Sequence, residues 1–128
     1  MSVLISIIES GGYADFKPVY SDLGYDTIEV NSVRKAISVM KKQPPQVIVA
    51  EFNFQSDFRD RTSSLETLLA TVEGRYPDCK IVVLYEEGFL EPFQRLQSCY
   101  QIDEALCFPV TPETIKHALS NLPLQRTF

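Results

Sequence analysis

Five short strand-like runs, separated by segments of helical periodicity, constrain the fold of this chain more than any other feature. Apolar and β-branched runs of this length are typical of strands that are buried in a parallel sheet. The third run is followed by a single acidic residue, Glu51, where a loop begins, and ligands of open α/β sheets bind at such carboxyl ends. The five runs cover residues 3–8, 26–30, 46–50, 81–84 and 105–107.

The segments between the runs repeat apolar residues three and four positions apart, as amphipathic helices do. Gly24 predicts the end of the first helix, Asn31 or Ser32 the cap of the second, and Thr111 the cap of the last. The predicted core faces are Phe16, Val19, Tyr20 and Leu23; Val33, Ala36, Ile37 and Met40; Leu65, Leu68, Leu69 and Val72; Phe93, Leu96 and Tyr100; and Ile115, Ala118, Leu119 and Leu122.

The alternation of strands and helices predicts the architecture. Each connection is long enough for a right-handed crossover, so a parallel sheet covered by helices on both sides is the consistent solution. We expect the α/β class and a flavodoxin-like (βα)5 fold, a doubly wound five-stranded sheet of order 2-1-3-4-5. A length of 128 residues with 45% hydrophobic content matches one domain, residues 1–128.

Composition argues against several function classes. The formal charge of −5 and the pI near 4.8 do not favour nucleic acid as a partner, and we interpret Lys41-Lys42 as a helix end. No stretch approaches the roughly 18 apolar residues of a membrane span, and the first segment lacks a basic leader. We therefore expect a cytoplasmic protein that does not bind a membrane.

The residues that often carry chemistry form no recognisable set. Cys79, Cys99 and Cys107 show no CxxC spacing, so neither a disulfide framework nor a zinc site is predicted. His117 is the only histidine and has no Cys or Asp at a matching spacing, so we expect it to face solvent. The sequence predicts no enzyme, metal or cofactor from these residues.

Several local phrases spread over the whole chain point to a known family. They are Leu23-Gly24-Tyr25 before the second run, Ala36 in the second helix, residues 45–51, and Phe108-Pro109-Val110 after the fifth run. In order and spacing they resemble the receiver domain of bacterial response regulators. The resemblance implies a module of two-component signal transduction.

The resemblance also implies a phosphotransfer site, from which this chain departs. The family places an acidic pair after strand one, an Asp after strand three, a Thr or Ser after strand four and a Lys before proline after strand five. Mg²⁺ requires hard oxygen ligands, and the acyl phosphate needs a cation and a hydroxyl. The corresponding residues here are Ile7 and Ile8, with Glu9 one position later, then Glu51, Tyr85 and Phe108 before Pro109, while Ala105 replaces a rotating aromatic residue.

These substitutions predict a degenerate receiver, without metal or phosphate, that acts by protein–protein interaction. Glu51 either mimics a phosphorylated acceptor or is a tolerated carboxylate near the solvated strand end. We expect a cis bond between Phe108 and Pro109. An exposed apolar patch at the family's usual interface would support a homodimer. The candidate interface residues are Phe89, Phe93, Gln97, Tyr100 and Ala105, with the turn at Phe108.

Two other functions stay open at this level. The turn Gly11-Gly12 after the first run is where a flavodoxin-like protein holds a nucleotide or flavin phosphate, although two glycines alone are a weak signal. A receiver that phosphorylates an unconventional side chain, such as Asp57 or Asp60, is the third possibility. Both residues lie in the long segment 52–64, whose aromatic side chains either tuck under the loop or contact a partner.

Overall fold

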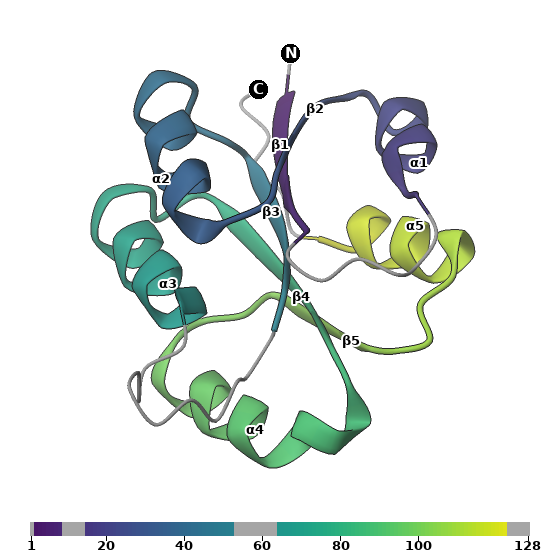
Figure 1. The fold of residues 1–128 in the computed structure, drawn as a ribbon. Coiled ribbons are helices and arrows are strands. Elements are labelled where there is room, and N and C mark those ends of the chain that lie inside the picture. The colour runs from purple at the N-terminus through teal and green to yellow at the C-terminus, as the bar shows by residue number, and fades with distance from the viewer. Residues whose placement is uncertain (1, 9–14, 53–63, 123–128) are drawn as a thin grey trace.

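The computed structural model describes residues 2–8, 15–52 and 64–122, which form one parallel sheet with helices on both faces (Figure 1). All neighbouring strands run parallel, and their order is β2-β1-β3-β4-β5. The predicted class, strand number and strand order are therefore confirmed. The strands are β1 (Ser2–Ile7), β2 (Tyr25–Val30), β3 (Val47–Glu51), β4 (Lys80–Tyr85) and β5 (Glu104–Cys107).

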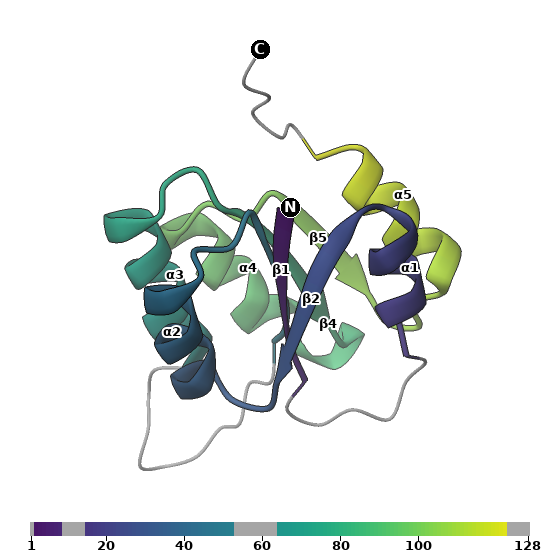
Figure 2. The ribbon, with the colours of Figure 1, turned by 90° about the horizontal axis from the view of Figure 1, so that it is seen from above.

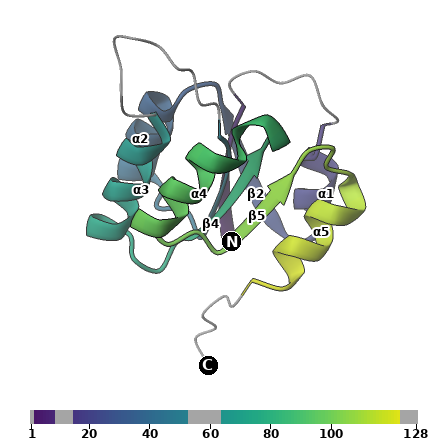
Figure 3. The same cartoon turned by 90° about the horizontal axis from the view of Figure 1, so that it is seen from below.

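The helices form two layers. Figures 2 and 3 show α2, α3 and α4 together on one face of the sheet and α1 and α5 on the other. A short 3₁₀ helix, η1 (Glu87–Phe89), leads directly into α4. The helices are α1 (Lys17–Asp22), α2 (Val33–Lys42), α3 (Ser64–Arg75), α4 (Leu90–Cys99) and α5 (Pro112–Ser120).

The inner strands are buried on both faces. Successive side chains of a strand point to opposite sides of a sheet, so each of β1, β3 and β4 supplies two cores. Burial of one such aliphatic side chain contributes about 1.5–3 kcal/mol to stability. The side chains toward α2, α3 and α4 include Ile5, Ile48, Ala50, Ile81 and Val83, and those toward α1 and α5 include Leu4, Val47, Val49, Val82 and Leu84.

The outer strands differ from that pattern. β5 forms one edge of the sheet, and its residues are partly buried up to an exposed Cys107. β2 forms the other edge, and its burial also alternates with exposure. A strand with one neighbour and an incomplete helical cover leaves part of each face to solvent.

The predicted helix ends are confirmed where the structure describes them. The Ser32 hydroxyl accepts a hydrogen bond from the Lys35 N–H at 3.1 Å, and the Thr111 hydroxyl accepts one from the Thr114 N–H at 3.1 Å. Gly24 follows α1 with φ of 89°, a conformation that favours glycine. Lys41 and Lys42 lie in the last turn of α2. In the described ranges, no helix has the length and apolar content that crossing a membrane requires.

We predict that Ser32→Ala lowers the free energy of unfolding by about 1 kcal/mol, because the first turn of α2 loses its side-chain acceptor. Ser38→Ala is the matched control, since Ser38 is exposed in the same helix and no cap depends on it. Alanine is the better helix former, so this variant should equal the parent or exceed it by a few tenths of a kcal/mol. Urea denaturation measures both. Equal losses in the two variants would contradict the capping role.

Candidate functional site

The carboxyl ends of β1, β3, β4 and β5 meet at one edge of the sheet, where a ligand of this fold class would bind. The strand register pairs Ile7 with Ala50, Glu51 with Leu84, and Tyr85 with Cys107. Four of the residues predicted from the sequence, Ile7, Glu51, Tyr85 and Phe108, therefore end or directly follow strands at this edge. The tertiary structure brings together residues that are up to about a hundred positions apart.

Glu51 is the last residue of β3 and is only 7% exposed. It takes part in an interaction with a neighbouring group. A buried carboxylate is costly unless it is engaged in this way. The expectation of a solvated strand end is thus wrong for this side chain, because the surrounding structure covers it.

An aromatic cluster lies at the same carboxyl edge, on the face of the sheet that α2, α3 and α4 cover. The rings of Tyr85 and Phe93 stack at a centroid distance of 4.4 Å and an interplanar angle of 16°. Phe52, which follows Glu51, packs against Phe93 at 5.5 Å and 59°. Both phenylalanines are almost fully buried. The end of β4 is therefore closed by stacked rings where a small hydroxyl side chain would leave an open position.

The Tyr85 phenol is kept in its protonated form. Desolvation by its surroundings, with a smaller effect from the adjacent Cys107 thiol, raises the pKa of Tyr85. The Cys107 thiol itself donates weakly to the Phe108 carbonyl, with 3.5 Å between sulfur and oxygen. The described side chains at the ends of β4 and β5 are thus a phenol and a thiol, and neither of them is a cation.

The described residues at this edge do not fit a divalent cation with a phosphoryl group. Ile7 is 2% exposed and packs in the core under α2, α3 and α4, and Ile8 is partly buried. Neither side chain has an oxygen atom to offer a metal. Within the described ranges no group of three or more His, Cys, Asp or Glu side chains could hold a metal ion. Glu9 lies outside the described residues.

The turn after β5 has the predicted geometry. The peptide bond between Phe108 and Pro109 is cis, which confirms the expectation. The Phe108 N–H donates to the Tyr85 carbonyl at 2.8 Å, and its ring packs against the core under α1 and α5. A partly buried aromatic ring that packs against the core therefore stands where the resemblance implies a lysine.

The predicted interface is only partly available at the surface. Phe93 is 1% exposed, so its place among the contact residues is wrong: its ring is held in the core by Tyr85 and Phe52. Phe89, Tyr100 and Ala105 are partly buried and pack on the same core, while Gln97 is exposed. Leu90, at 39%, is the one exposed large apolar side chain among the described residues, so they present no broad apolar patch for a homodimer.

The predictions for His117 and the cysteines are confirmed, whereas two other predicted features lie outside the described residues. His117 is exposed on α5, with its Nε2 3.0 Å from the Asn121 amide nitrogen. All three cysteines are free thiols, with Cys79 buried and the other two exposed. The Gly11-Gly12 turn lies outside the described residues, as do Asp57, Asp60 and the rest of residues 53–63.

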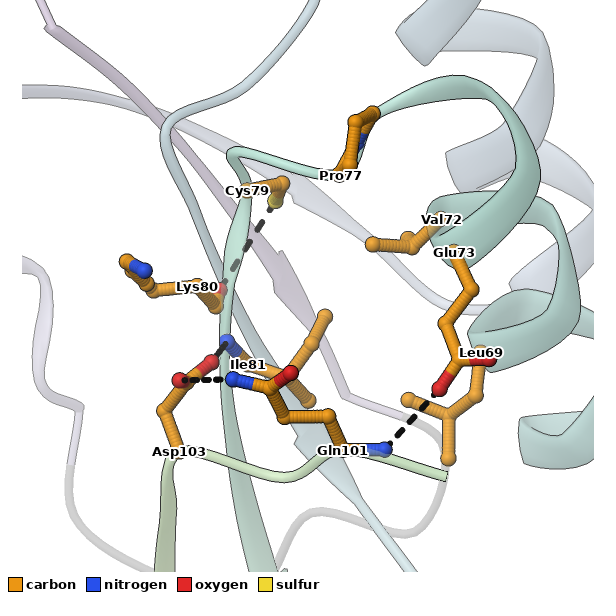
Figure 4. A pocket seen from close by; sticks show the side chains of 9 residues that line it. All are labelled: Leu69, Val72, Glu73, Pro77, Cys79, Lys80, Ile81, Gln101 and Asp103. Carbon is orange, nitrogen blue, oxygen red and sulfur yellow. Dashed lines mark hydrogen bonds between the residues drawn. The ribbon is translucent and has the colours of Figure 1, made fainter. Parts of the chain in front are cut away.

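A hollow of about 380 Å³ lies at the other end of the strands, beside the amino ends of β4 and β5 (Figure 4). Its carboxylates bind backbone N–H groups. Asp103 accepts from the Ile81 N–H at 2.8 Å, and Glu73 accepts from the Gln101 N–H at 3.0 Å. These bonds fasten the segment before β5 to α3 and β4, so the polar lining serves the fold. The sequence reasoning missed them, because each bond joins residues at least 22 positions apart.

Cys79 lines this hollow and is 6% exposed. Its thiol donates weakly to the Lys80 carbonyl at 3.7 Å. Burial, together with the negative charge of Asp103, raises the pKa of the Cys79 thiol to about 12. A thiol held protonated in this way is a poor nucleophile, which agrees with a structural role.

The fold matches solved structures over nearly its whole length. A response regulator receiver domain protein from Clostridium thermocellum superimposes with a TM-score of 0.74 at 16% identity, covering 94% of this chain and 93% of that one. The chemotaxis response regulator CheY4 of Vibrio cholerae gives 0.74 at 17% identity, covering 94% and 97%. A CheY-like receiver domain protein from Methanospirillum hungatei gives 0.75 at 12% identity, covering 94% and 91%.

These likenesses show the fold of response-regulator receiver domains. No protein-family model matches the sequence, and no curated protein matches it. The structural agreement thus coexists with low sequence identity to these structures, between 12% and 17%.

We predict that alkaline pH destabilises the chain through Cys79. The folded-state pKa lies above the ordinary value of 9.0, so between pH 9 and about 12 the folded chain retains a proton that the unfolded chain loses. The free energy of unfolding therefore falls as pH rises through this window, by no more than about 1.4 kcal/mol per pH unit for one group. Urea denaturation under reducing conditions at pH 7, 9 and 10 measures the slope.

The variant Cys79→Ala distinguishes the effect of this thiol on stability from that of the tyrosines. The pKa values of Tyr20, Tyr25 and Tyr85 are also raised, but from 10.0, so these phenols lower the free energy of unfolding mainly above pH 10. The variant should be less stable at neutral pH because a small cavity forms, and its stability should change less between pH 9 and 10. An unchanged slope in that interval would contradict the assignment.

We also predict that Asp103→Ala costs about 1–3 kcal/mol of stability, because the Ile81 N–H, in a buried strand, loses its acceptor. Glu73→Ala is the matched control: it removes an acceptor from the exposed Gln101, where water replaces it, and should cost well under about 1 kcal/mol. Thermal and urea denaturation compare the two. If Asp103→Ala were as stable as the parent, the structural role of this carboxylate would be contradicted.

Proposed function

We propose that residues 1–128 form one receiver-like domain that has lost phosphotransfer chemistry and works by binding a protein partner. It is a non-enzymatic signalling module of the response-regulator type, with no metal, phosphate or other cofactor in its cycle. The fold supports the receiver part of this proposal. The residues at the carboxyl edge support the degenerate part.

The observation that carries the proposal is the stack of Tyr85 on Phe93 at the same carboxyl edge as a buried Glu51. A phosphorylated side chain at residue 51 would bring nearly two negative charges to this edge. Such charge is stabilised by a metal, a cation or oriented N–H and O–H donors. The described residues that end or follow the strands at this edge include instead the aliphatic Ile7 and the aromatic Tyr85 and Phe108.

The absent switch residues support a constitutive conformation. In the family that the chain resembles, a hydroxyl after strand four and an aromatic residue in strand five move together on phosphorylation. Here Tyr85 is held by its stack and Ala105 has no ring to rotate. The chain would therefore present one state of its α4–β5 surface, and the partner rather than the phosphate would decide when signalling occurs.

Glu51 has two roles under this proposal. A carboxylate one methylene longer than Asp imitates the position of an acyl phosphate, with about half of its charge. The alternative role is structural, since the side chain is buried and engaged by a neighbour. Glu51→Gln distinguishes them once a partner is known: unchanged partner affinity at unchanged stability would leave only the structural role.

We predict that incubation with acetyl phosphate and Mg²⁺ leaves the intact mass of the chain unchanged, because Ile7, Ile8 and Phe108 stand where the acidic pair and the lysine would be needed. A receiver domain with a complete acidic pair, Asp and Lys serves as the positive control in the same reaction. A mass gain of one phosphoryl group would overturn the proposal. Asp57→Asn, Asp60→Asn and Glu51→Gln would then locate the acceptor by loss of that gain.

A further inference from the structure

The outward face of α2 concentrates positive charge in an otherwise acidic chain. Four of the twelve Lys and Arg residues lie in this ten-residue helix, and all four side chains are exposed. With these charges set aside, the rest of the chain is more negative than the overall −5. The four residues, which we call the α2 basic face, are Arg34, Lys35, Lys41 and Lys42.

The helical period arranges the four cations as two stripes. Residues seven apart lie almost in line along a helix and are separated by about 10 Å. Arg34 therefore lies in line with Lys41, and Lys35 with Lys42. Ser38, which is exposed, falls between the stripes, three or four positions from each cation. The result is a rectangle of positive charge around one small hydroxyl side chain.

The opposite side of α2 fixes the orientation of this face. Val33, Ala36 and Met40 are buried in the core with α3 and the sheet. In Figures 1 and 2, α2 lies at the margin of its helical layer with α3 as its neighbour. Because the buried side is fully used for packing, the basic face must point outward.

Within the described residues, the charges on this face have no ion-pair partners. None of the four side chains forms an ion pair with a carboxylate in that part of the chain. Glu29 lines a shallow hollow of about 390 Å³ together with Lys35 and Asn31 at the amino end of α2. Arg34, Lys41 and Lys42 do not line that hollow.

The placement of two of these cations opposes local helix electrostatics. Arg34 and Lys35 lie in the first turn, where the helix dipole favours carboxylates, and α2 has no acidic residue there. Lys41 and Lys42 lie in the last turn, where the dipole favours cations. A departure from a local rule with no compensating contact is expected where function and not stability selects the residue.

We propose that the α2 basic face is the docking surface for an acidic helix of the partner protein, with carboxylate pairs seven residues apart. This inference rests on the proposed function, since it names the chemistry of the partner through which the module acts. Two parallel stripes of charge, about 10 Å long and on a straight helix, are complementary to two carboxylate pairs at the same spacing on another helix. The small Ser38 at the centre lets the partner approach closely.

A local acidic partner fits better than an extended polyanion. Nucleic acid or an anionic bilayer extends well beyond one helix of about 15 Å, and would meet the acidic remainder of the chain. Screening at physiological salt limits such repulsion to roughly 8 Å, so a partner confined to α2 escapes most of it. Exposed apolar side chains, which would anchor α2 in a bilayer, are missing from this helix.

The test uses a fluorescent, helix-stabilised peptide with glutamate pairs seven residues apart, and fluorescence anisotropy as the readout. The key variant neutralises Arg34, Lys35, Lys41 and Lys42 with glutamine. The matched control neutralises four exposed cations outside α2, namely Lys17, Arg75, Arg95 and Lys116, and so has the same net charge. We expect the α2 variant to bind at least tenfold more weakly than the parent and the control to bind within about twofold.

Two further arms make the test specific. Ser38→Glu inserts one negative charge at the centre of the face and should weaken binding at least threefold, whereas Ser38→Ala should not. A second peptide of the same composition, with its glutamates spread around the helix, should bind at least fivefold more weakly. Binding should also weaken as salt is raised, because the contact is electrostatic.

Several results would overturn the inference. Equal losses in the two quadruple variants, or equal binding of the two peptides, would indicate unspecific charge attraction. No binding of the patterned peptide would refute the docking surface. Binding of duplex DNA or of phosphatidylserine vesicles that the α2 variant abolishes, without peptide binding, would assign the face to nucleic acid or to a membrane instead.

The outcome is separable from that of the proposed function. Lys35 lines a hollow with Ile8 and Val30 at the carboxyl ends of β1 and β2, but the phosphodonor experiment is run on the parent chain and so does not depend on the α2 substitutions. If the chain is not phosphorylated and does not bind the peptide, the proposed degenerate receiver stands and the docking surface does not. A chain that is phosphorylated and still binds the peptide through α2 keeps the docking surface but is not degenerate.

Discussion

Burial of β1, β3 and β4 on both faces is the constraint on which the rest of the structure depends. Each of these strands sends alternate side chains into two separate cores, so a helical layer is needed on each side. Crossovers of one hand place helices on both faces only if the strand order reverses direction. The order β2-β1-β3-β4-β5 reverses at β1, so α1 lies on one face and α2, α3 and α4 lie on the other.

The carboxyl edge illustrates that this fold constrains its two cores more than it constrains the residues at the strand ends. Nothing in the two cores requires oxygen ligands or a cation at the strand ends, so those positions can take apolar groups without loss of packing. Tyr85 and Phe52 extend the core under α4 by contacting Phe93, and Phe108 extends the other core. Part of this edge thus continues the two cores, and Glu51 is itself buried.

The carboxylates beside β4 and β5 and the cations of α2 differ in what they contact. The hollow beside β4 and β5 uses its carboxylates to bind backbone N–H groups, which serves the fold. The α2 basic face is unpaired within the described residues and serves no contact there. Sequence reasoning noticed only Lys41-Lys42 and interpreted the pair as a helix end. The adjacent pair Arg34-Lys35, seven residues earlier, was the signal that would have revealed the face.

The sequence by itself determined the order of elements, the parallel sheet, the caps at Ser32 and Thr111, and the exposed position of His117, because local periodicity and capping chemistry are written in neighbouring residues. The resemblance to receiver domains also identified Ile7, Glu51, Tyr85 and Phe108 as residues of one edge. Only the tertiary structure decided that Glu51 is buried and that Asp103 binds the backbone of β4. It also decided between the two predictions for Phe93, which lies in the core and not at an interface. Those outcomes depend on contacts between distant segments, and no local pattern records which side chain will fill a given space.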